Sequence, residues 1–228
     1  MKKNKVILTG SEGLIGKKVY KYLSKKYEIV RADLKLGLDL TNSKDVKSFF
    51  KNNNSCDFLI NMHGYNEHVM KNKKKIKKDE FISEDEFYKF FFNNVYSFYL
   101  TSECFIKYSK KPKGIINFSS IYSLASPKHN IYQSPKNLFY IASKFAVNGL
   151  TKYYATMYGK KTNVNAIANH GVKWKQPKEF IKKLNSHIPK NRMMETEDLY
   201  GILELLCSDK SKYINGSIIV VDGGYTAW

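Results

Sequence analysis

Residues Thr9–Gly16 read T-G-S-E-G-L-I-G and directly follow the apolar run Lys5–Thr9. Glycine at Gly10, Gly13 and Gly16 permits a tight turn and lets a pyrophosphate approach the backbone N–H groups at a helix N-terminus. Because a second apolar run follows the helical pattern after this turn, the stretch predicts a dinucleotide-binding βαβ unit.

The rest of the chain alternates short apolar runs with longer runs of helical period, which is typical of a parallel sheet with crossover helices. The apolar runs predict strands at 5–9, 28–32, 57–61, 114–118, 163–167 and 217–221. The other runs predict helices at about 13–25, 43–52, 80–110, 136–159, 177–185 and 196–208. We therefore expect an α/β fold with one domain over 1–228. Its core is a Rossmann-type, doubly wound parallel sheet of six to seven strands with helices on both faces.

Two segments interrupt this alternation. The run K-N-K-K-K-I-K-K at 71–78 predicts a solvated loop or a fraying helix end. The irregular stretch 121–139 contains Pro127 and Pro135 and joins a strand to a helix. Connections of this length in compact domains usually carry function, so we expect a substrate lid there.

The charge of the chain is strongly positive, with 39 Lys and Arg against 20 Asp and Glu and a formal net charge of +19. Only Arg31 and Arg192 are arginines, whereas phosphate and base recognition favours the planar guanidinium. We interpret the surplus as a compositional bias and expect no nucleic-acid partner. The alternative is an electrostatic attraction for a phosphorylated or acidic substrate.

Membrane and metal binding are not expected. No apolar stretch of about 18 residues is present to span a bilayer, and residues 1–30 lack the pattern of a secretory signal. The three cysteines, Cys56, Cys104 and Cys207, lack metal-type spacing. We therefore expect a cytoplasmic protein with no metal site.

Asp33 ends the second predicted strand. A carboxylate at this place accepts hydrogen bonds from the adenosine ribose hydroxyls and repels a 2′-phosphate, which favours NAD over NADP. The nearby cations Arg31 and Lys35 act against that preference, and an ordinary loop aspartate is the alternative.

Tyr140 and Lys144 lie four residues apart in Y-I-A-S-K, on one face of a predicted helix. A tyrosine that acts as an acid or base near neutral pH needs its pKa lowered from about 10 by roughly 2 to 3 units. A neighbouring ammonium and a positive nicotinamide ring favour the phenolate in this way. Ser119 and Ser120 follow a buried strand, at the sheet edge where ligands bind. Either hydroxyl is suited to bind a substrate oxygen or to cap the strand end, and we favour Ser120 for the substrate.

Taken in order, these motifs resemble the single-domain short-chain dehydrogenase/reductases over nearly the whole chain. The shared motifs are T-G-x-x-x-G-x-G at 9–16, Asp33, D-L at 39–40, N-M-H-G at 61–64, N-V-Y-S at 94–97, S-S at 119–120, Y-x-x-x-K at 140–144 and V-D-G-G at 221–224. The resemblance implies an NAD-dependent oxidoreductase that interconverts an alcohol and a ketone.

The resemblance also implies roles for individual residues. Tyr140 is the general acid/base, Lys144 binds the nicotinamide ribose and lowers the tyrosine pKa, Ser120 orients the substrate oxygen, and Asn94 holds a water in a proton relay. A substrate flap is implied at 172–195. The implied cofactor contacts are Gly10, Ser11, Glu12, Leu14, Ile15, Gly16, Asp33, Asp39, Leu40, Asn61, His63, Gly64, Tyr140, Lys144 and Val172.

Three features depart from the family pattern. The turn A-N-H-G at 168–171 replaces the family's P-G, His63 replaces a small residue, and the interval from Ser120 to Tyr140 is longer than usual. His63 and His170 also suggest metal ligands or bases, an interpretation that we set aside. The departures leave a non-catalytic NAD-binding regulator of the same fold as the alternative function.

The substrate and assembly are predicted more coarsely. The S-S-I-Y-S stretch, the long loop and the ending V-D-G-G-Y-T-A-W are similar to bacterial family members of surface-sugar pathways, including flagellin and nonulosonic-acid modification. This implies a sugar or sugar-nucleotide substrate. Surplus aromatic residues on helices 80–110 and 136–159 predict a homodimer or homotetramer through these helices.

Overall fold

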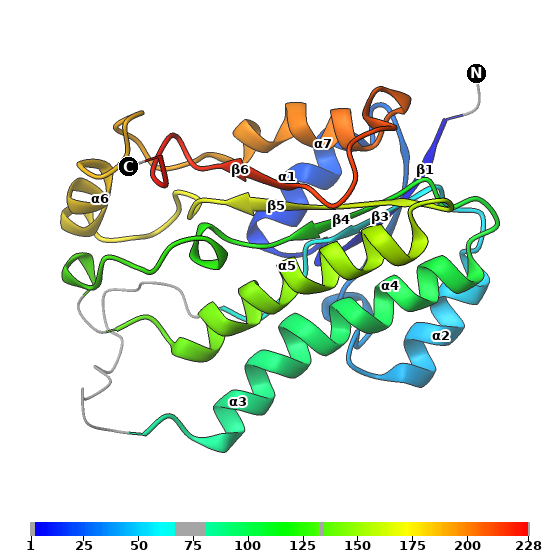
Figure 1. The fold of residues 1–228 in the computed structure, drawn as a ribbon, viewed down its shortest axis with the longest axis horizontal. Helices are drawn as coiled ribbons and strands as arrows, with labels where there is room; N and C mark the ends of the chain where they lie inside the picture. The colour runs from blue at the N-terminus through cyan, green and yellow to red at the C-terminus, as the bar shows by residue number, and fades with distance from the viewer. Residues whose placement is uncertain (1–2, 67–80, 133–134, 228) are drawn as a thin grey trace.

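The computed structural model describes residues 3–66, 81–132 and 135–227. Its centre is a six-stranded parallel sheet with the order β2-β1-β3-β4-β5-β6 (Figure 1). The strands are β1 Lys5–Thr9, β2 Glu28–Ala32, β3 Phe58–Asn61, β4 Gly114–Phe118, β5 Asn163–Asn169 and β6 Ile218–Val221. The helices are α1 Leu14–Leu23, α2 Ser43–Asn52, α3 Glu84–Phe91, α4 Ser97–Tyr108, α5 Leu138–Tyr158, α6 Lys178–Asn185 and α7 Tyr200–Leu206. The predicted Rossmann-type sheet is confirmed.

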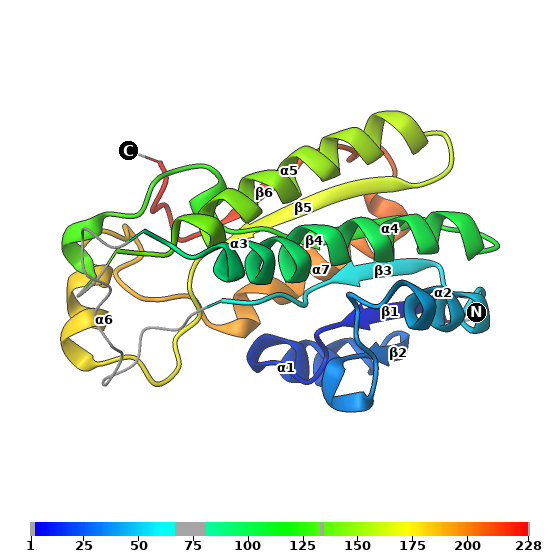
Figure 2. The ribbon, with the colours of Figure 1, turned by 90° about the horizontal axis from the view of Figure 1, so that it is seen from below.

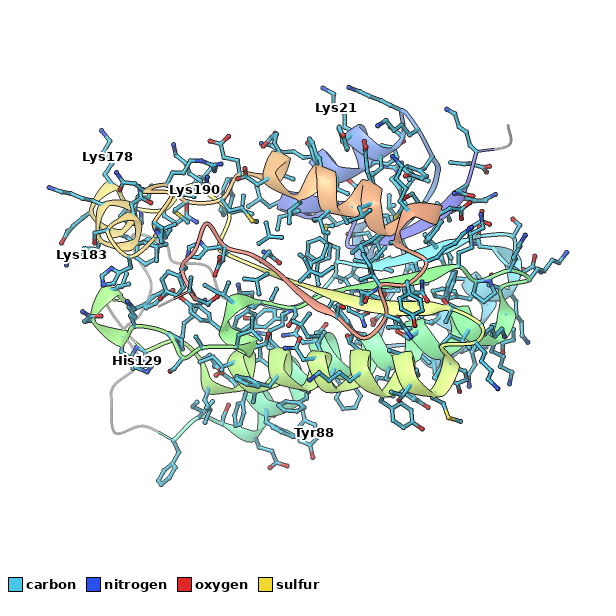
Figure 3. The ribbon with its side chains drawn as sticks, turned by 45° about the horizontal axis from the view of Figure 1, so that its top comes forward. Lys21, Tyr88, His129, Lys178, Lys183 and Lys190 are labelled. Atoms are coloured by element: carbon cyan, nitrogen blue, oxygen red, sulfur yellow. The ribbon has the colours of Figure 1, made fainter. Side chains whose placement is uncertain are left out.

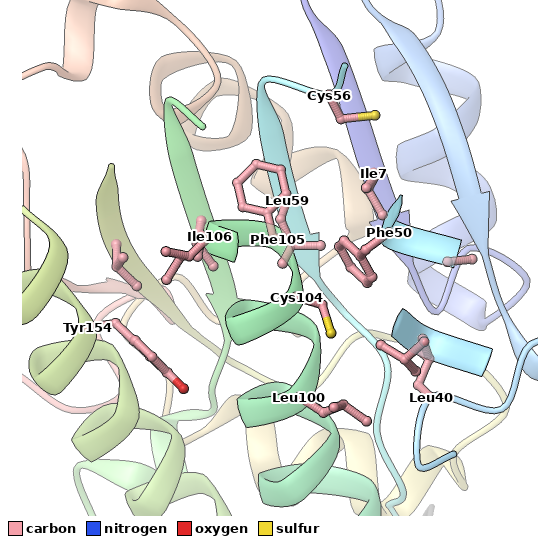
Figure 4. Packing of buried hydrophobic residues seen from close by; sticks show 14 of the residues in the cluster. Ile7, Leu40, Phe50, Cys56, Leu59, Leu100, Cys104, Phe105, Ile106 and Tyr154 are labelled. Atoms are coloured by element: carbon pink, nitrogen blue, oxygen red, sulfur yellow. The ribbon is translucent and has the colours of Figure 1, made fainter. Parts of the chain in front are cut away.

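Helices cover both faces of the sheet, α2, α4 and α5 on one side and α1 and α7 on the other (Figures 1 and 2). Side chains of β1 alternate between the two layers, because Ile7 packs under α2 and α4 while Val6 and Leu8 pack under α1 and α7. Figure 4 shows the first layer, where Phe50 and Phe105 meet Ile7. Burial on both faces explains why the central strands β1, β3 and β4 are nearly continuous apolar runs.

A buried chain of hydrogen bonds ties two helices to the strand ends. Thr101 of α4 donates to Asn61 of β3 (2.9 Å), Asn61 donates to Asn117 of β4 (3.0 Å), and Asn117 donates to Thr151 of α5 (3.0 Å). All four side chains are buried, so each bond also satisfies a polar group that burial would otherwise leave unpaired. The chain fixes α4 and α5 against the edge of the sheet where β3 and β4 end.

The helix predicted at 80–110 is shorter than expected and is not a regular α-helix throughout. It begins at Glu84, where the Ser83 side chain accepts a hydrogen bond from the N–H of Glu86, and it contains a π-helical turn at Phe92–Tyr96. Asn94, inside that turn, is fully buried and bonds across the chain to Tyr65 and Ser143. Those distant contacts have no counterpart in the local sequence pattern.

The predicted lid and flap lie at one end of the molecule (Figure 1). Segment 121–139 forms the 3-10 turns Ile121–Ser123 and His129–Ile131. In segment 172–195 an isolated parallel bridge pairs Val172 with Met194, and α6 lies between them. The two segments touch, because the Tyr132 and Phe180 rings are 5.4 Å apart.

The lysine run predicted at 71–78 lies outside the described residues. Within residues 3–66, 81–132 and 135–227, no helix has the length and apolar character that crossing a bilayer requires.

Candidate functional site

Three neighbouring strands end together and bring their following loops to one place. Thr9 pairs with Asn61, and Asn61 pairs with Asn117. The glycine-rich turn, residues 62–66 and the two serines after β4 therefore meet at one edge of the sheet. They surround a cavity of about 370 Å³. Its walls include these predicted site residues: Gly10, Leu14, Ile15, Gly16, His63, Gly64, Ser120, Tyr140, Lys144 and Val172.

The glycine-rich turn is packed too tightly for side chains. Gly10 has a φ of 67°, and a Cβ there would lie 2.7 Å from the Cα of His63. A Cβ on Gly16 would lie 2.0 Å from the Gly10 carbonyl oxygen. The exposed backbone between β1 and α1 is therefore available to an anion, which fits the pyrophosphate of a dinucleotide.

Asp33 stands beside this turn at the end of β2. One carboxylate oxygen accepts a hydrogen bond from the N–H of Glu12 and the other from the N–H of Lys35, each at 2.9 Å. The Glu12 carboxylate in turn pairs with Arg31 at 2.9 Å. Two carboxylates therefore stand at this end of the site, and the nearest guanidinium already has an anionic partner.

Tyr140 and Lys144 of α5 both lie on the cavity wall and are buried, with 8% and 6% of their surface exposed. The Lys144 ammonium lies 6.0 Å from the Tyr140 ring centre and donates to the Phe118 carbonyl at 2.9 Å. Burial lowers the pKa of Lys144 to about 8. Burial also raises the pKa of Tyr140, and a hydrogen bond with Ser120 only partly offsets this. The lowering of the tyrosine pKa that we expect from Lys144 together with a positive nicotinamide ring stays a prediction, and it has to overcome this desolvation.

The two serines after β4 differ in their contacts. The Ser119 hydroxyl donates to Ser123 at 2.8 Å, with the Lys144 carbonyl at 3.2 Å. Ser120 is hydrogen-bonded to Tyr140, and its hydroxyl also accepts a 3.2 Å bond from the N–H of Tyr122. The geometry thus favours Ser120 over Ser119 as the partner of a substrate oxygen.

Asn94 lies behind the cavity wall rather than in it. Its amide donates to the Tyr65 carbonyl (2.9 Å) and to Ser143 (3.0 Å), and it accepts from the Tyr65 N–H (2.6 Å). Gly64 packs against this amide, since a Cβ at Gly64 would lie 2.9 Å from the Asn94 side-chain oxygen. Asn94 therefore fixes the loop at 64–65 beside Lys144.

Both ring nitrogens of His63 are engaged inside the protein. Nδ1 lies 2.6 Å from the Thr9 hydroxyl and Nε2 lies 2.7 Å from the Ser97 hydroxyl. Because Ser97 donates its own proton to the Asn93 carbonyl, it accepts from Nε2–H, which assigns the Nε2–H tautomer. Burial and the charge of Lys144 lower the pKa of His63 to about 3. The imidazole is therefore neutral near pH 7.

Several predicted cofactor contacts lie outside the cavity wall: Ser11, Glu12, Asp33, Asp39, Leu40 and Asn61. Two of them have buried side chains. Leu40 belongs to the apolar layer under α2 and α4, and Asn61 belongs to the buried hydrogen-bond chain. Asp39 is exposed to solvent, and its carboxylate accepts two hydrogen bonds from Thr41.

The turn at 168–171 places His170 on the cavity wall beside the C-terminal segment. His170 is buried, its ring lies 5.1 Å from the Tyr225 ring, and burial lowers its pKa. The cavity therefore has an aromatic, uncharged wall at the turn where the family pattern has a proline. Among the described residues, no three or more His, Cys, Asp or Glu side chains gather in a metal-binding group.

Sequence reasoning missed Lys136, which lines the cavity with its ammonium 5.1 Å from the Tyr140 ring centre. It also missed Thr9 and Ser97, the partners of His63. The four-residue interval between Lys136 and Tyr140 could have indicated that the two side chains lie close together. The contact between His63 and Ser97 could not be predicted in this way, because the two residues lie far apart in the chain.

Comparisons with known proteins agree with this arrangement. A family model described as enoyl-(acyl carrier protein) reductase matches residues 4–226. Post-translational flagellin modification protein A of Campylobacter coli is 33% identical over 134 residues, 56% of this chain and 52% of that protein. The 7alpha-hydroxysteroid dehydrogenase of Paraclostridium sordellii is 33% identical over 189 residues, 79% of this chain and 66% of that protein. The chain thus spans about half to two thirds of the length of these curated relatives.

A solved structure also superposes over nearly the whole chain. The short chain dehydrogenase from Leptospira borgpetersenii, with bound NAD+, has a TM-score of 0.84 and 26% identity, and the match covers 99% of this chain and 94% of that one.

His63 makes the stability of the protein depend on pH. We expect the free energy of unfolding to fall as the pH drops from about 6.5 toward 3, because the unfolded imidazole binds a proton that the folded one does not. The contribution of this residue is at most about 1.4 kcal/mol per pH unit. Urea unfolding between pH 7 and pH 4.5 should show a shallower pH slope in His63→Gln than in the wild type.

The control is His129→Gln, since His129 is exposed and projects from the surface (Figure 3). Its pH slope should equal that of the wild type. Equal slopes in His63→Gln and the wild type would show that the imidazole titrates alike in the folded and unfolded chains.

Proposed function

Because the chain belongs to the short-chain dehydrogenase/reductase family, we propose that it is an NAD-dependent oxidoreductase that interconverts an alcohol and a ketone. The observation that carries this proposal is the convergence of Ser120, Tyr140 and Lys144 on a cavity that begins at the glycine-rich turn. Residues 1–228 then act as a single NAD-binding domain, with a lid at 121–139 and a flap at 172–195.

In this proposal Ser120, Tyr140 and Lys144 have different roles in the reaction. When bound, an oxidised nicotinamide accepts the hydride that leaves the reacting carbon. Ser120 orients the substrate oxygen, and Tyr140 takes the hydroxyl proton during oxidation or returns it during reduction. Lys144 holds positive charge beside the phenolate, and Asn94 supports the loop that faces Lys144. Oxidation needs the phenolate form of Tyr140, so its rate should rise with pH, whereas reduction needs the phenol and should decline.

The substrate is proposed to be a sugar or sugar nucleotide of surface-glycan biosynthesis. The likeness to the flagellin modification protein supports the pathway. The cavity supports a polar ring compound, because Tyr122, Tyr132 and Phe180 give it aromatic walls and Gln176 and Asn169 give it amides. Aromatic faces pack against the C–H groups of a sugar while the amides bind its hydroxyls.

NAD is proposed over NADP on electrostatic grounds. The carboxylates of Asp33 and Glu12 stand together at the end of β2. A 2′-phosphate would face both, and the ion pair with Glu12 engages the Arg31 guanidinium that would otherwise attract it.

A second copy of the chain is the proposed partner of α3, α4 and α5. These helices lie side by side on one face of the molecule (Figure 2). Their outer surface carries Tyr88, Phe92, Tyr99, Phe145, Tyr153 and Met157, each at least 43% exposed. Exposed apolar side chains gathered on one face often mark a protein interface, which supports a homodimer or homotetramer.

The first test is the variant Tyr140→Phe. It should lose about 10²- to 10⁴-fold in turnover of a panel of sugar alcohols and keto sugars, because the proton acceptor is gone. The dissociation constant of NADH, measured by calorimetry, should change less than about threefold, which is under 1 kcal/mol. Tyr213→Phe removes the same hydroxyl from a fully exposed tyrosine and should change neither value.

Turnover that survives in Tyr140→Phe would contradict the assignment of the acid/base. NADH binding by the wild type with no turnover anywhere in the panel would favour the non-catalytic regulator.

The cofactor proposal is tested by Asp33→Ser, which keeps a side-chain oxygen to cap the following turn. We expect the ratio of NADP to NAD dissociation constants to move at least about tenfold toward NADP, since one repelling carboxylate is removed. Calorimetric titration with each cofactor measures the ratio. Asp45→Ser removes an equal charge at an exposed position of α2 and should leave the ratio unchanged. A wild type that prefers NADP would overturn the proposal.

The assembly is tested by the double variant Phe145→Glu, Tyr153→Glu. Light scattering should show a dimer or tetramer for the wild type and a monomer for the variant, because two carboxylates cannot be buried in an apolar interface. Tyr213→Glu, which also charges an exposed aromatic position, should keep the wild-type mass. A wild type that is monomeric at micromolar concentration would contradict the proposal.

A further inference from the structure

His170 carries a buried ring nitrogen that no protein group satisfies. The residue follows directly on β5, lines the cavity and has 2% of its surface exposed. Its Nδ1 lies 3.2 Å from the carbonyl oxygen of Gly171, whereas its Nε2 has no hydrogen-bond partner in the part of the chain that the structure describes. Because the large majority of buried polar atoms in folded proteins are hydrogen-bonded, such an atom on a cavity wall indicates a partner that arrives with a ligand.

The unpaired nitrogen is a hydrogen-bond acceptor. A carbonyl oxygen can only accept, so the contact with Gly171 places the ring proton on Nδ1 and leaves a lone pair on Nε2. Burial lowers the pKa of His170, and the imidazole is therefore neutral near pH 7. The partner that suits Nε2 is an O–H or N–H group, which a carboxylate cannot supply.

The neighbours of His170 do not supply this donor. The Tyr225 ring packs edge to face against the imidazole, with the ring centres 5.1 Å apart. The Asp222 carboxylate is itself an acceptor and is bonded to the N–H and the hydroxyl of Thr226. The backbone N–H of His170 donates to the Val221 carbonyl at 2.9 Å, which fixes the residue against β6. The fold therefore holds the imidazole in place and leaves Nε2 to a ligand.

His170 lies closer in the sheet to Ser120 than to the glycine-rich turn. β4 and β5 are neighbours, and where they end the Ser119 N–H donates to the Ile167 carbonyl at 2.9 Å. Ser120 and His170 thus come shortly after two paired strands, at the end of the molecule that also carries α6 and the C-terminal segment (Figure 1). β3 and β4 separate β5 from the turn after β1. This location favours the substrate over the cofactor phosphates as the partner of Nε2.

We propose that His170 is a specificity-determining residue whose Nε2 accepts a hydrogen bond from a second hydroxyl of the substrate, beside the hydroxyl that Ser120 and Tyr140 bind. This inference rests on the proposed oxidoreductase function and adds to it the requirement for a polyhydroxy substrate. The carboxamide N–H of the nicotinamide is a second source of the same donor chemistry, and the experiments distinguish the two.

The first experiment removes ligand hydroxyls one at a time. The sugar alcohol or keto sugar with the highest kcat/KM is compared with deoxy analogues, each of which lacks one hydroxyl other than the reacting one. In the wild type one analogue should lose at least about tenfold in kcat/KM, because a site that binds a hydroxyl discriminates against a compound without it. His170→Phe keeps a ring against Tyr225 but has no acceptor, so the parent compound and that analogue should then differ by less than about threefold.

Two further variants separate the acceptor from the packing of the ring. His170→Gln supplies an amide oxygen that accepts a hydrogen bond, and it should restore the discrimination. His129→Phe removes an exposed imidazole that does not line the cavity, and it should keep the wild-type ratio. The inference is overturned if the discrimination persists in His170→Phe. It is also overturned if His170→Gln discriminates as poorly as His170→Phe, since the loss would then come from packing.

Nuclear magnetic resonance of the full chain with nitrogen-15 histidine provides a measurement that needs no turnover. The His170 signals are assigned by their absence from His170→Gln. The Nε2 resonance should have the shift of an unprotonated nitrogen and should move upfield when the NADH-bound chain is saturated with the same sugar alcohols, which NADH cannot oxidise. A move with NADH alone would assign the donor to the carboxamide and overturn the inference. The reduced 3-acetylpyridine analogue, which lacks the amide N–H, should then cause no move.

The two proposals fail in different ways. If Tyr140-dependent turnover is found but no hydroxyl depends on His170, only this inference fails. If NADH binds and nothing in the panel is turned over, the proposed function fails. The resonance titration with the same compounds still tests His170 in that case, because a hydrogen bond at Nε2 needs no hydride transfer. An Nε2 resonance that none of the compounds moves would overturn the inference.

Discussion

The site depends on the hydrogen-bond chain that runs from Thr101 through Asn61 and Asn117 to Thr151. It joins α4, two strand ends and α5 inside an otherwise apolar layer. Each amide here has a fixed partner, so a slip of either helix along the sheet would leave buried polar groups unpaired, at a cost of about 1 to 3 kcal/mol each. Since Tyr140 and Lys144 belong to α5 and Asn94 adjoins α4, this constraint sets where the polar groups of the cavity stand.

Local patterns in the sequence were sufficient for most of the sheet. Strands β1, β2 and β4 have the predicted bounds. For β1 and β4 the reason is that a strand buried on both faces is a short apolar run whatever surrounds it. The π-helical turn at Phe92–Tyr96 was not predictable in this way. It depends on Asn94 bonding to Tyr65 and Ser143, residues that lie far away in the chain. Likewise Asn61 stands in a motif near the cofactor turn, yet its burial commits it to the sheet.

The sequence also located Tyr140 and Lys144, but their proton affinities could not be obtained from spacing. Spacing indicates that a cation is near, whereas the pKa depends on how much water both groups lose. In the structure, burial acts on both residues, raising the pKa of Tyr140 and lowering that of Lys144 to about 8. Each shift disfavours the charged form. A positive charge bound near Tyr140 would act against this desolvation, so we expect the proton affinity of Tyr140 to depend on whether the nicotinamide is bound.

A similar distinction applies to the net charge of +19. Most lysines, such as Lys178 and Lys183 on α6, point into solvent, where physiological salt screens their fields within about 8 Å. Such charges reveal the composition of the chain and little about its ligand. Lys144 differs because it is buried on the cavity wall, where it donates to the Phe118 carbonyl and where burial lowers its pKa to about 8. Perturbed groups of this kind gather at functional sites. This one buried lysine therefore says more about the chemistry of the site than the whole exposed surplus does.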